Sequence, residues 1–297
     1  MMDKPAHRRI GIVGLGAIGS PVACHLAASG HDVTGYDRDP ARAAMLAADG
    51  VSAADGLAGL AGSDIVLVLV ATPAQLGRVI GEIAMWPDTG MPAYVVVSSS
   101  VAPADMQAAA RALAGRPVRI VDAPVSGGVV AARSGKLTFL VGGETQDVSA
   151  LTPLFMPLAR AVHHCGPLGS GQAVKSINNL IAVTNLFISA EAFALALDAG
   201  LDLGQIRPAL EAGSARNFLT DPTSDPAAVF AVWSDDPEDF HAVNAINSKD
   251  FALAIDLAAP GSTLPTVAAM RGVIAQAGDE TLANWRRAAA SFKKEKL

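Results

Sequence analysis

The chain has 297 residues, of which 51% are hydrophobic and 17% are charged, and its formal net charge is −6. This size and hydrophobic share favour two domains with well-buried cores, and the acidic balance argues against nucleic acid or an anionic membrane as a partner. Aromatic residues make up only 5% of the sequence, so we expect cores built mainly of Ala, Val, Leu and Ile.

Cysteine and histidine usage points away from disulfides and metals. Cys24 and Cys165 lie far apart without CxxC spacing, so we expect free thiols in a reducing compartment. The six histidines show no ligand spacing with acidic partners, which argues against a metal site. The opening segment MMDKPAHRR lacks an apolar signal-peptide core, and no apolar run reaches membrane-spanning length without polar interruption. We therefore expect a cytoplasmic protein with no membrane or nucleic-acid partner.

In the first half of the chain, short runs rich in Val and Ile alternate with Ala-rich helical stretches. The predicted strands cover residues 9–13, 32–36, 64–70, 93–98, 118–122, 137–142 and 161–165. The gaps between the first five strands are long enough for one crossover helix each, which predicts a parallel sheet with helices on both faces.

From about Gly171 onward, helical apolar periodicity continues to the C-terminus. The sequence therefore predicts an α/β parallel-sheet domain at residues 1–168, followed by an all-helical domain at residues 169–297. The Pro-rich stretch 221–239 is the least regular part, and we expect a loop there with one short helical turn.

The stretch RIGIVGLGAIG places Gly14, Gly16 and Gly19 in GxGxxG spacing directly after the first strand. In a dinucleotide-binding loop these glycines permit a tight turn, close approach of a pyrophosphate, and close packing of helix on strand. Amides of Ala17, Ile18 and the following helical turn are then expected to attract the phosphates. This context favours a Rossmann-type NAD(P)-binding domain over a similar fold that binds no dinucleotide.

The tip of the second strand bears on the choice between NAD and NADP. Asp37 lies 18 residues after Gly19, where an acid accepts hydrogen bonds from the ribose hydroxyls and repels a 2′-phosphate. Its neighbour Arg38 could instead hold that phosphate. We predict that NAD is preferred, with NADP as the alternative.

Further residues follow the third and fourth strands, and ligands of open α/β sheets bind beyond the carboxyl ends of strands. On this ground Ala71, Thr72 and Ser99 are predicted to line the cofactor site. Ordinary helix and turn caps would explain Thr72 and Ser98, taken alone, equally well.

The segment DAPVSGG follows the fifth strand and places Ser126, Gly127 and Gly128 at its end. A hydroxyl with unobstructed backbone amides suits a carboxylate. A plain β-turn is the alternative interpretation.

The stretch GPLGSGQAVKSINNL opens an apolar helix with one cation, Lys175, and two amides, Asn178 and Asn179. Oxidation of an alcohol needs a base for the hydroxyl proton, and desolvation in a partly dry cleft lowers the pKa of a lysine toward neutral pH. Lys175 and Asn179 are at i and i+4, so both can reach one substrate oxygen. A snorkelling lysine would explain the cation, but not the amides and glycines around it.

The order of GLGAIG, Asp37, DAPVSGG, GSGQAVKSINN and SKDFALA resembles the β-hydroxyacid dehydrogenase family, and the likeness spans nearly the whole chain. The resemblance implies a Rossmann domain and a helical domain with the active site between them, a small carboxylic acid substrate, and a homodimer or homotetramer. It also implies that Lys175 is the catalytic lysine, that Asn179 holds the substrate, and that residues 126–128 grip the substrate carboxylate. By resemblance alone, Lys249 is a second lysine near the nicotinamide.

The chain departs from the family pattern in three places. Val97 stands where an acid is common, TPAQ replaces a Pro-Asn type turn after the third strand, and residues 213–245 differ most. The resemblance therefore implies a dehydrogenase of a small 3-hydroxy acid, or a reductase of the matching semialdehyde, with the individual substrate open.

Three alternatives share parts of this pattern. An imine reductase has the same architecture but generally lacks the lysine. A non-catalytic NAD sensor has no use for Lys175, Asn179 and Lys249 together. A 6-phosphogluconate dehydrogenase is much longer and has a His-Asn pair where this chain has Asn178-Asn179.

Overall fold

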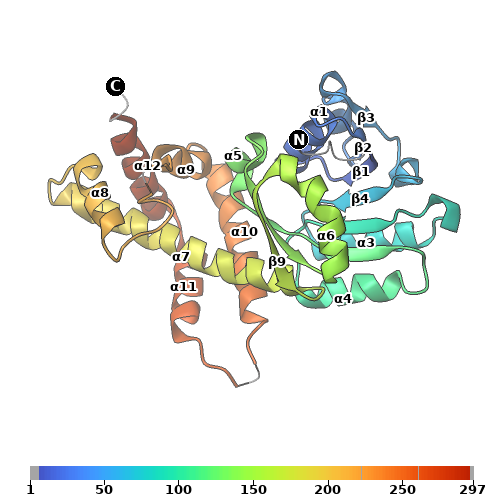
Figure 1. The fold of residues 1–297 in the computed structure, drawn as a ribbon. Helices are drawn as coiled ribbons and strands as arrows, with labels where there is room; N and C mark the ends of the chain where they lie inside the picture. The colour runs from blue at the N-terminus through green and yellow to red at the C-terminus, as the bar shows by residue number, and fades with distance from the viewer. Residues whose placement is uncertain (1–6, 222, 260, 295–297) are drawn as a thin grey trace. The chain divides into compact units, whose positions relative to one another are not determined.

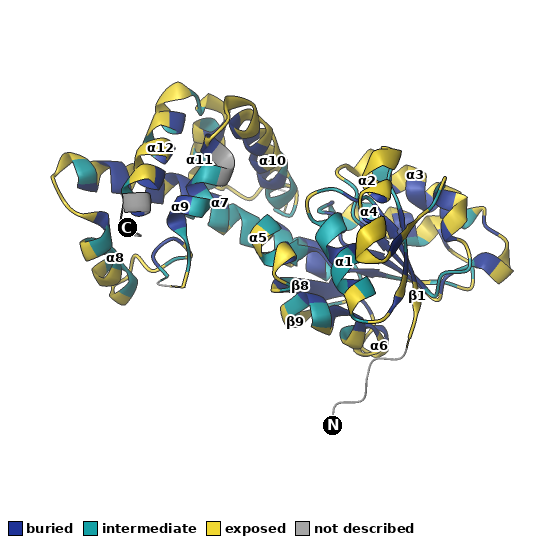
Figure 2. Cartoon of the chain, turned by 90° about the horizontal axis from the view of Figure 1, so that it is seen from above, coloured by how far each residue is buried: buried dark blue, intermediate teal, exposed yellow. Residues whose placement is uncertain are grey.

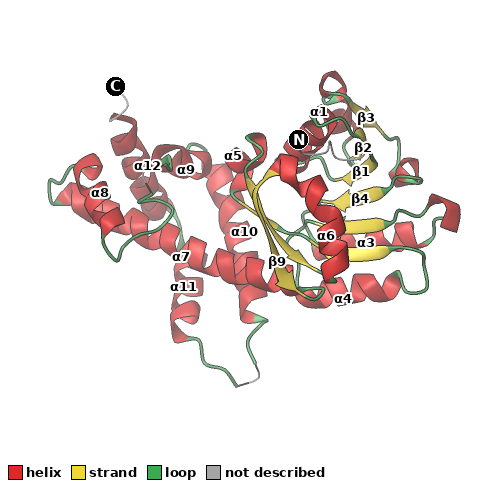
Figure 3. Ribbon diagram, viewed as in Figure 1, coloured by secondary structure: helices red, strands yellow, loops and turns green. Residues whose placement is uncertain are grey.

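The computed structural model describes residues 7–221, 223–259 and 261–294, and the chain divides into two compact units, residues 1–175 and 176–297. Strands occur in the first unit, and the second unit is helical (Figures 1 and 3). The predicted fold class is therefore confirmed, a parallel-sheet Rossmann-type domain followed by an all-helical domain. The division between the units falls inside one long helix, between Lys175 and Ser176.

A sheet of nine strands forms the centre of the first unit in the described part of the chain. The strands are β1 Arg9–Val13, β2 Asp32–Tyr36, β3 Val51–Ala53, β4 Ile65–Val68, β5 Tyr94–Val97, β6 Arg119–Asp122, β7 Val125–Ser126, β8 Leu137–Gly142 and β9 Ala159–Gly166. Their order is β3-β2-β1-β4-β5-β6-β8-β7, with β9 beside β8. β1 to β6 are parallel in the order typical of dinucleotide-binding sheets, whereas β8 runs antiparallel to β6 and β7.

Alternation along the strands divides the apolar side chains of the sheet between two cores. In β4, Ile65 and Leu67 belong to the core on one face, whereas Val66 and Val68 belong to the core on the other. Both faces are therefore covered, and the central strands of the sheet are dark with buried residues in Figure 2, whereas β9 is more exposed. The helices of this unit are α1 Gly19–Ala28, α2 Pro40–Ala44, α3 Pro73–Ala84, α4 Pro103–Ala112, α5 Gly128–Arg133 and α6 Thr145–Phe155.

The second unit packs its helices around aromatic side chains. The long helix α7 Ser170–Asp198 leads into α8 Leu203–Ala212, α9 Pro226–Ser234, α10 Pro237–Ile255, α11 Pro265–Gln276 and α12 Asp279–Lys294. The fully buried Trp285 meets Phe187, Phe230 and Phe240 at ring-centroid distances of 5.4, 6.1 and 5.3 Å. Most of the buried residues of this core are Ala, Val, Leu and Ile, as the composition predicts, and the aromatic residues among them cluster around Trp285.

Residues 221–239 are more regular than expected. α9 begins at Pro226 after the N-cap Asp225, and α10 begins at Pro237 after the N-cap Asp236. Proline suits the first turn of a helix, where no backbone N–H is needed, so these Asp-Pro pairs start helices and do not mark a loop. The expected loop is thus replaced over nine residues by α9.

One helix in the described ranges, α7, is long and apolar enough to cross a membrane by length and composition. A core helix of a soluble protein passes the same test. Val183, Phe187 and Phe193 of α7 are buried in the core of the second unit. The absence of a membrane partner remains a prediction.

Candidate active site

The loop between β1 and α1 has glycine wherever a side chain would collide. A Cβ on Gly14, which has a φ of +94°, would lie 2.4 Å from the carbonyl oxygen of Leu69. A Cβ on Gly19 would lie 1.9 Å from the carbonyl oxygen of Gly14, so this glycine lets α1 pack against the end of β1. Gly16 faces more open space. The N-cap residue Ile18 is apolar and cannot cap α1, so the geometry fits a phosphate at this helix N-terminus.

Asp37 connects the tip of β2 to this loop. Its carboxylate accepts hydrogen bonds from the backbone N–H groups of Leu15, at 2.8 Å, and Asp39, at 3.0 Å. The cation beside it is Arg42 of α2, whose Nη1 lies 3.9 Å from Asp37 Oδ2, whereas Arg38 is exposed. The sequence interpretation missed Arg42, although the Asp39-Pro40 pair marks a helix start that brings the next turn back toward Asp37.

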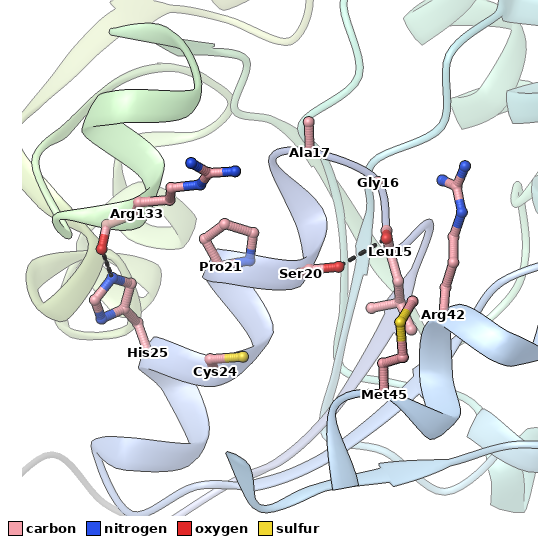
Figure 4. Close-up of a pocket in the computed structure, with 10 residues that line it drawn as sticks. All are labelled: Leu15, Gly16, Ala17, Ser20, Pro21, Cys24, His25, Arg42, Met45 and Arg133. Carbon is pink, nitrogen blue, oxygen red and sulfur yellow. Dashed lines mark hydrogen bonds between the residues drawn. The ribbon is translucent and has the colours of Figure 1, made fainter. Parts of the chain in front are cut away.

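A pocket of about 550 Å³ opens along the outer side of α1 (Figure 4). Arg42 and Arg133 lie on opposite sides of the first turn of α1, and Ser20 Oγ donates to the carbonyl oxygen of Leu15 at 2.7 Å. The two guanidinium groups give this pocket the positive charge that phosphate oxygens require. Its lining is Leu15, Gly16, Ala17, Ser20, Pro21, Cys24, His25, Arg42, Met45 and Arg133.

The residues after β4 and β5 serve the fold directly. Thr72 is the N-cap of α3 in a capping box, and Gln75 Oε1 accepts from the N–H groups of Ala71 and Thr72 at 2.9 and 3.1 Å. Ser99 is buried, and its hydroxyl accepts from the N–H of Val70 at 2.8 Å. These contacts favour the capping interpretation of Thr72. They also give the Ser99 hydroxyl a structural role, and its place in a cofactor site remains a prediction.

The DAPVSGG segment turns from a strand into a helix, and the plain β-turn interpretation is wrong. Ser126 ends β7 opposite Thr138 of β8. Gly127 and Gly128 both have positive φ, +118° and +65°, and a Cβ on Gly127 would lie 2.5 Å from the Cβ of Ala131. Because the two glycines have no side chains, the backbone here is uncovered, as the predicted binding of a substrate carboxylate requires.

Lys175 is half-buried on α7, one turn after a tightly bonded helix start. Asp122, the last residue of β6, is fully buried and accepts from the backbone N–H groups of Gly169, at 2.6 Å, and Gln172, at 2.8 Å. Burial raises the pKa of Asp122 to about 6, although the backbone hydrogen bonds act in the opposite direction. The sequence interpretation assigned no role to Asp122.

In the second unit, Asp250 brings two predicted residues together. Asn179 Nδ2 donates to Asp250 Oδ2 at 2.6 Å, and Lys249 Nζ lies 3.7 Å from Asp250 Oδ1. Asn178 Nδ2 donates to Asn179 Oδ1 at 3.2 Å, so the Asn179 amide is oriented from both ends. Asp250 is 7% exposed, and only its place beside Lys249 in SKD could have indicated it.

Both cysteines are free thiols. Within residues 7–221, 223–259 and 261–294 no group of three or more His, Cys, Asp and Glu side chains could hold a metal ion. The absence of a metal remains a prediction.

Two family models together match nearly the whole chain. The NAD binding domain of 6-phosphogluconate dehydrogenase matches residues 9–166. The NAD-binding domain of NADP-dependent 3-hydroxyisobutyrate dehydrogenase matches residues 169–290.

Individual proteins show the same likeness. The chain is 32% identical over 261 residues to a probable 3-hydroxyisobutyrate dehydrogenase of Mycobacterium tuberculosis, covering 86% of this chain and 87% of the relative. It is 30% identical over 213 residues to the NAD-dependent L-serine dehydrogenase of Pseudomonas aeruginosa, covering 71% of this chain and 72% of that relative. The solved structure of Mycobacterium tuberculosis 3-hydroxyisobutyrate dehydrogenase with L-serine superposes with a TM-score of 0.75 at 26% identity, covering 98% of this chain and 100% of the other.

Proposed function

We propose a function for this chain from the family to which it belongs, the 3-hydroxyisobutyrate dehydrogenase family of β-hydroxyacid dehydrogenases. In this proposal it interconverts a small 3-hydroxy acid and the matching semialdehyde, with Lys175 as general acid/base. The observation that carries this proposal is the coexistence of a dinucleotide-type glycine loop with Lys175 and, four residues later on α7, an Asn179 amide oriented by the buried Asp250. A nicotinamide cofactor, when bound, supplies the hydride acceptor or donor.

In the proposed reaction Lys175 moves the proton. When the alcohol is oxidised, the neutral Nζ takes the hydroxyl proton as hydride leaves the carbon, and in the reverse direction the ammonium protonates the carbonyl oxygen. A positioned acid/base group of this kind contributes about 10²- to 10⁴-fold in rate.

Asn179 orients the reacting oxygen in this proposal. One N–H of its amide is bonded to Asp250, and the same nitrogen has a second N–H that donates to the substrate oxygen. Because Asp250 and Asn178 hold the amide from both ends, no side-chain rotation is needed at the moment of reaction.

The substrate carboxylate is assigned to Ser126, Gly127 and Gly128. The Ser126 hydroxyl and the uncovered backbone at the two glycines supply neutral donors. With the carboxylate at these residues and the hydroxyl at Lys175, the proposed substrate is a small 3-hydroxy acid.

The preferred cofactor is proposed to be NAD, with NADP as the alternative. Asp37 stands at the tip of β2 with its carboxylate fixed by Leu15 and Asp39, where it would repel a 2′-phosphate. Arg42, 3.9 Å away, partly offsets that charge and is the residue through which NADP could be accepted.

A homodimer or homotetramer in the cytoplasm completes the proposal. Ile177, Ile181, Ile188 and Leu195 are between 50% and 69% exposed and recur on α7 at four- and seven-residue spacing, which suits a face covered by a second copy. Light scattering of the wild type and Ile181→Glu tests the assembly, and a monomeric wild type would contradict it.

The test of the activity is absorbance of the reduced nicotinamide with NAD or NADP and a panel of 3-hydroxyisobutyrate, L-serine, glycerate and threonate. We expect turnover on at least one acid, a loss of about 10²-fold or more in Lys175→Ala, and wild-type rates in Lys136→Ala, which alters an exposed lysine of the same unit. Turnover that survives Lys175→Ala would refute the mechanism. No turnover on the panel, with cofactor binding intact, would refute the substrate class.

A further inference from the structure

The buried carboxylate of Asp122 is tied to the first turn of α7. Its two oxygens each accept one backbone N–H, from Gly169 at 2.6 Å and from Gln172 at 2.8 Å. Carboxylates suit helix N-termini because they satisfy otherwise unpaired N–H groups and complement the helix dipole. Lys175 follows Gln172 by three residues, so the carboxylate is bonded to the helical turn directly before the proposed acid/base.

The surrounding backbone leaves this carboxyl group no freedom to move. A Cβ on Gly142 of β8 would lie 2.4 Å from Asp122 Oδ1, and a Cβ on Gly171 of α7 would lie 2.7 Å from Oδ2. The same Cβ on Gly171 would lie 2.2 Å from the carbonyl oxygen of Leu140. Glycine at both positions therefore allows strand, carboxylate and helix to meet at contact distance.

The side chain of Gln172 forms further hydrogen bonds between the start of α7 and the neighbouring strand ends. Its Oε1 accepts from the N–H of Val101 at 3.1 Å, and its Nε2 donates to the carbonyl oxygen of Ser99 at 2.8 Å. Ser99 Oγ in turn accepts from the N–H of Val70. The start of α7 is thus hydrogen-bonded to the end of β6 and to the segment after β5, and through Ser99 this segment bonds to Val70 after β4. These strand ends lie at the sheet edge where a cofactor is expected.

The ionised Asp122 carboxylate lowers the stability of the fold at neutral pH. Burial raises its pKa to about 6, whereas an unfolded aspartate titrates near its ordinary value of 3.8. Between these two values the folded protein binds more protons than the unfolded chain, so stability falls as pH rises, and ionised Asp122 is a net cost at neutral pH. What the carboxylate does in the structure is hold the backbone N–H groups of Gly169 and Gln172 at the start of α7.

We infer that Asp122 is a positioning residue for the proposed reaction, because it fixes the first turn of α7 and thereby sets Lys175 against the strand ends that bind the cofactor. This inference rests on the proposed function. Asp122 acts through Lys175 and does not touch the substrate.

The test is a double-mutant cycle of Asp122→Asn and Lys175→Ala. We expect Asp122→Asn to lower kcat by about 10- to 100-fold, since a displacement of about 1 Å costs rates of this order, and to change the Kd of NADH less than about two-fold. In Lys175→Ala the same substitution is expected to have no further effect, because the misplaced group is already absent. Asp147→Asn is the control, since Asp147 is also a buried acid of the same unit but bonds to Tyr94 and Arg119.

Two results would overturn the inference: an Asp122→Asn variant with wild-type kcat, or one that slows Lys175→Ala by the same factor as the wild type. Either differs from failure of the proposed function, in which Lys175→Ala itself stays active. Hydrogen exchange at the amides of residues 169–175 needs no turnover and is expected to rise in Asp122→Asn but not in Asp147→Asn. If Asp122→Asn fails to fold, Gly142→Ala perturbs the same carboxylate from the strand side, because its Cβ would lie 2.4 Å from Asp122 Oδ1. A wild-type kcat with unchanged exchange at residues 169–175 in that variant would also overturn the inference.

Discussion

The two units of this protein place their functional groups by different means. In the sheet unit, backbone geometry does so: Gly14 and Gly19 allow contacts that any side chain would block, and Asp37 bonds to the loop they form. In the helical unit, side chains do so: Asp250 of α10 holds Asn179 of α7 across 71 residues of sequence. A backbone constraint requires glycines at a fixed spacing, which can be recognised in the sequence. A side-chain pair between two helices requires no fixed spacing and cannot be recognised in this way.

The sheet unit should be most sensitive at its glycine loop. Gly19→Ala places a Cβ 1.9 Å from the carbonyl oxygen of Gly14, so the loop or α1 must shift, and we expect NADH affinity to fall by more than about 100-fold. Fluorescence titration measures this. Gly77→Ala in α3 is the control, because a Cβ there meets no atom within 4 Å, and it is expected to stabilise the unit by about 0.5–1 kcal/mol. Normal cofactor affinity in Gly19→Ala would contradict the claim that backbone geometry places the functional groups of the sheet unit.

The helical unit should lose turnover and keep cofactor affinity. Asp250→Asn can still accept from Asn179 but no longer with a full negative charge, so we expect kcat to fall about 10- to 100-fold. Steady-state kinetics beside Asp256→Asn, an exposed acid at the end of the same helix, measures the effect. Equal kinetics in the two variants would show that Asp250 does not orient Asn179.

A smaller effect is expected on the preference for NAD or NADP. It tests whether Asp37 or Arg42 determines this preference. Asp37→Asn removes the charge that repels a 2′-phosphate, and we expect NADPH affinity to rise about 10-fold. Adding Arg42→Ala should cancel that gain, because its guanidinium lies 3.9 Å from the Asp37 carboxylate. Titrations with NADH and NADPH decide this, and a gain that persists without Arg42 would exclude its role.

The smallest expected effect concerns the pH dependence of the sheet unit. Burial, together with the charges of His7 and Arg8, lowers the pKa of His31 below its ordinary value of 6.5. Below that value the unfolded chain binds the proton first, so we expect stability to fall slightly as pH drops. Urea unfolding at pH 7 and 5.5 measures it, and His31→Leu should flatten the dependence. An equally steep dependence in His31→Leu would assign it to another group.

Much of the sheet unit can be predicted from sequence. β1, β2 and β8 have the bounds predicted from the sequence, and β1 and β8 are buried along most of their length. β3 and β7 were missed because they have three and two residues, too few for a periodic signal.

The helical unit is harder to predict. Composition predicts a mainly aliphatic core, which this unit has, but it does not predict that Trp285 and several phenylalanines gather in one place. The Asp-Pro pairs at 225–226 and 236–237 were interpreted as loop signals, although each is an N-cap followed by the first helical residue. Asp250 has no local signal, because its meaning depends on a partner in another helix.

The central claim, that Lys175 moves the proton, is tested most directly by chemical rescue. Lys175→Ala would be assayed on the best substrate with increasing concentrations of a small primary amine. We predict a low basal rate that rises with amine concentration and that depends on the pKa of the amine, because the added base replaces the missing one. A basal rate near that of the wild type, or a slow variant that no amine accelerates, would contradict the role of Lys175 as general acid/base.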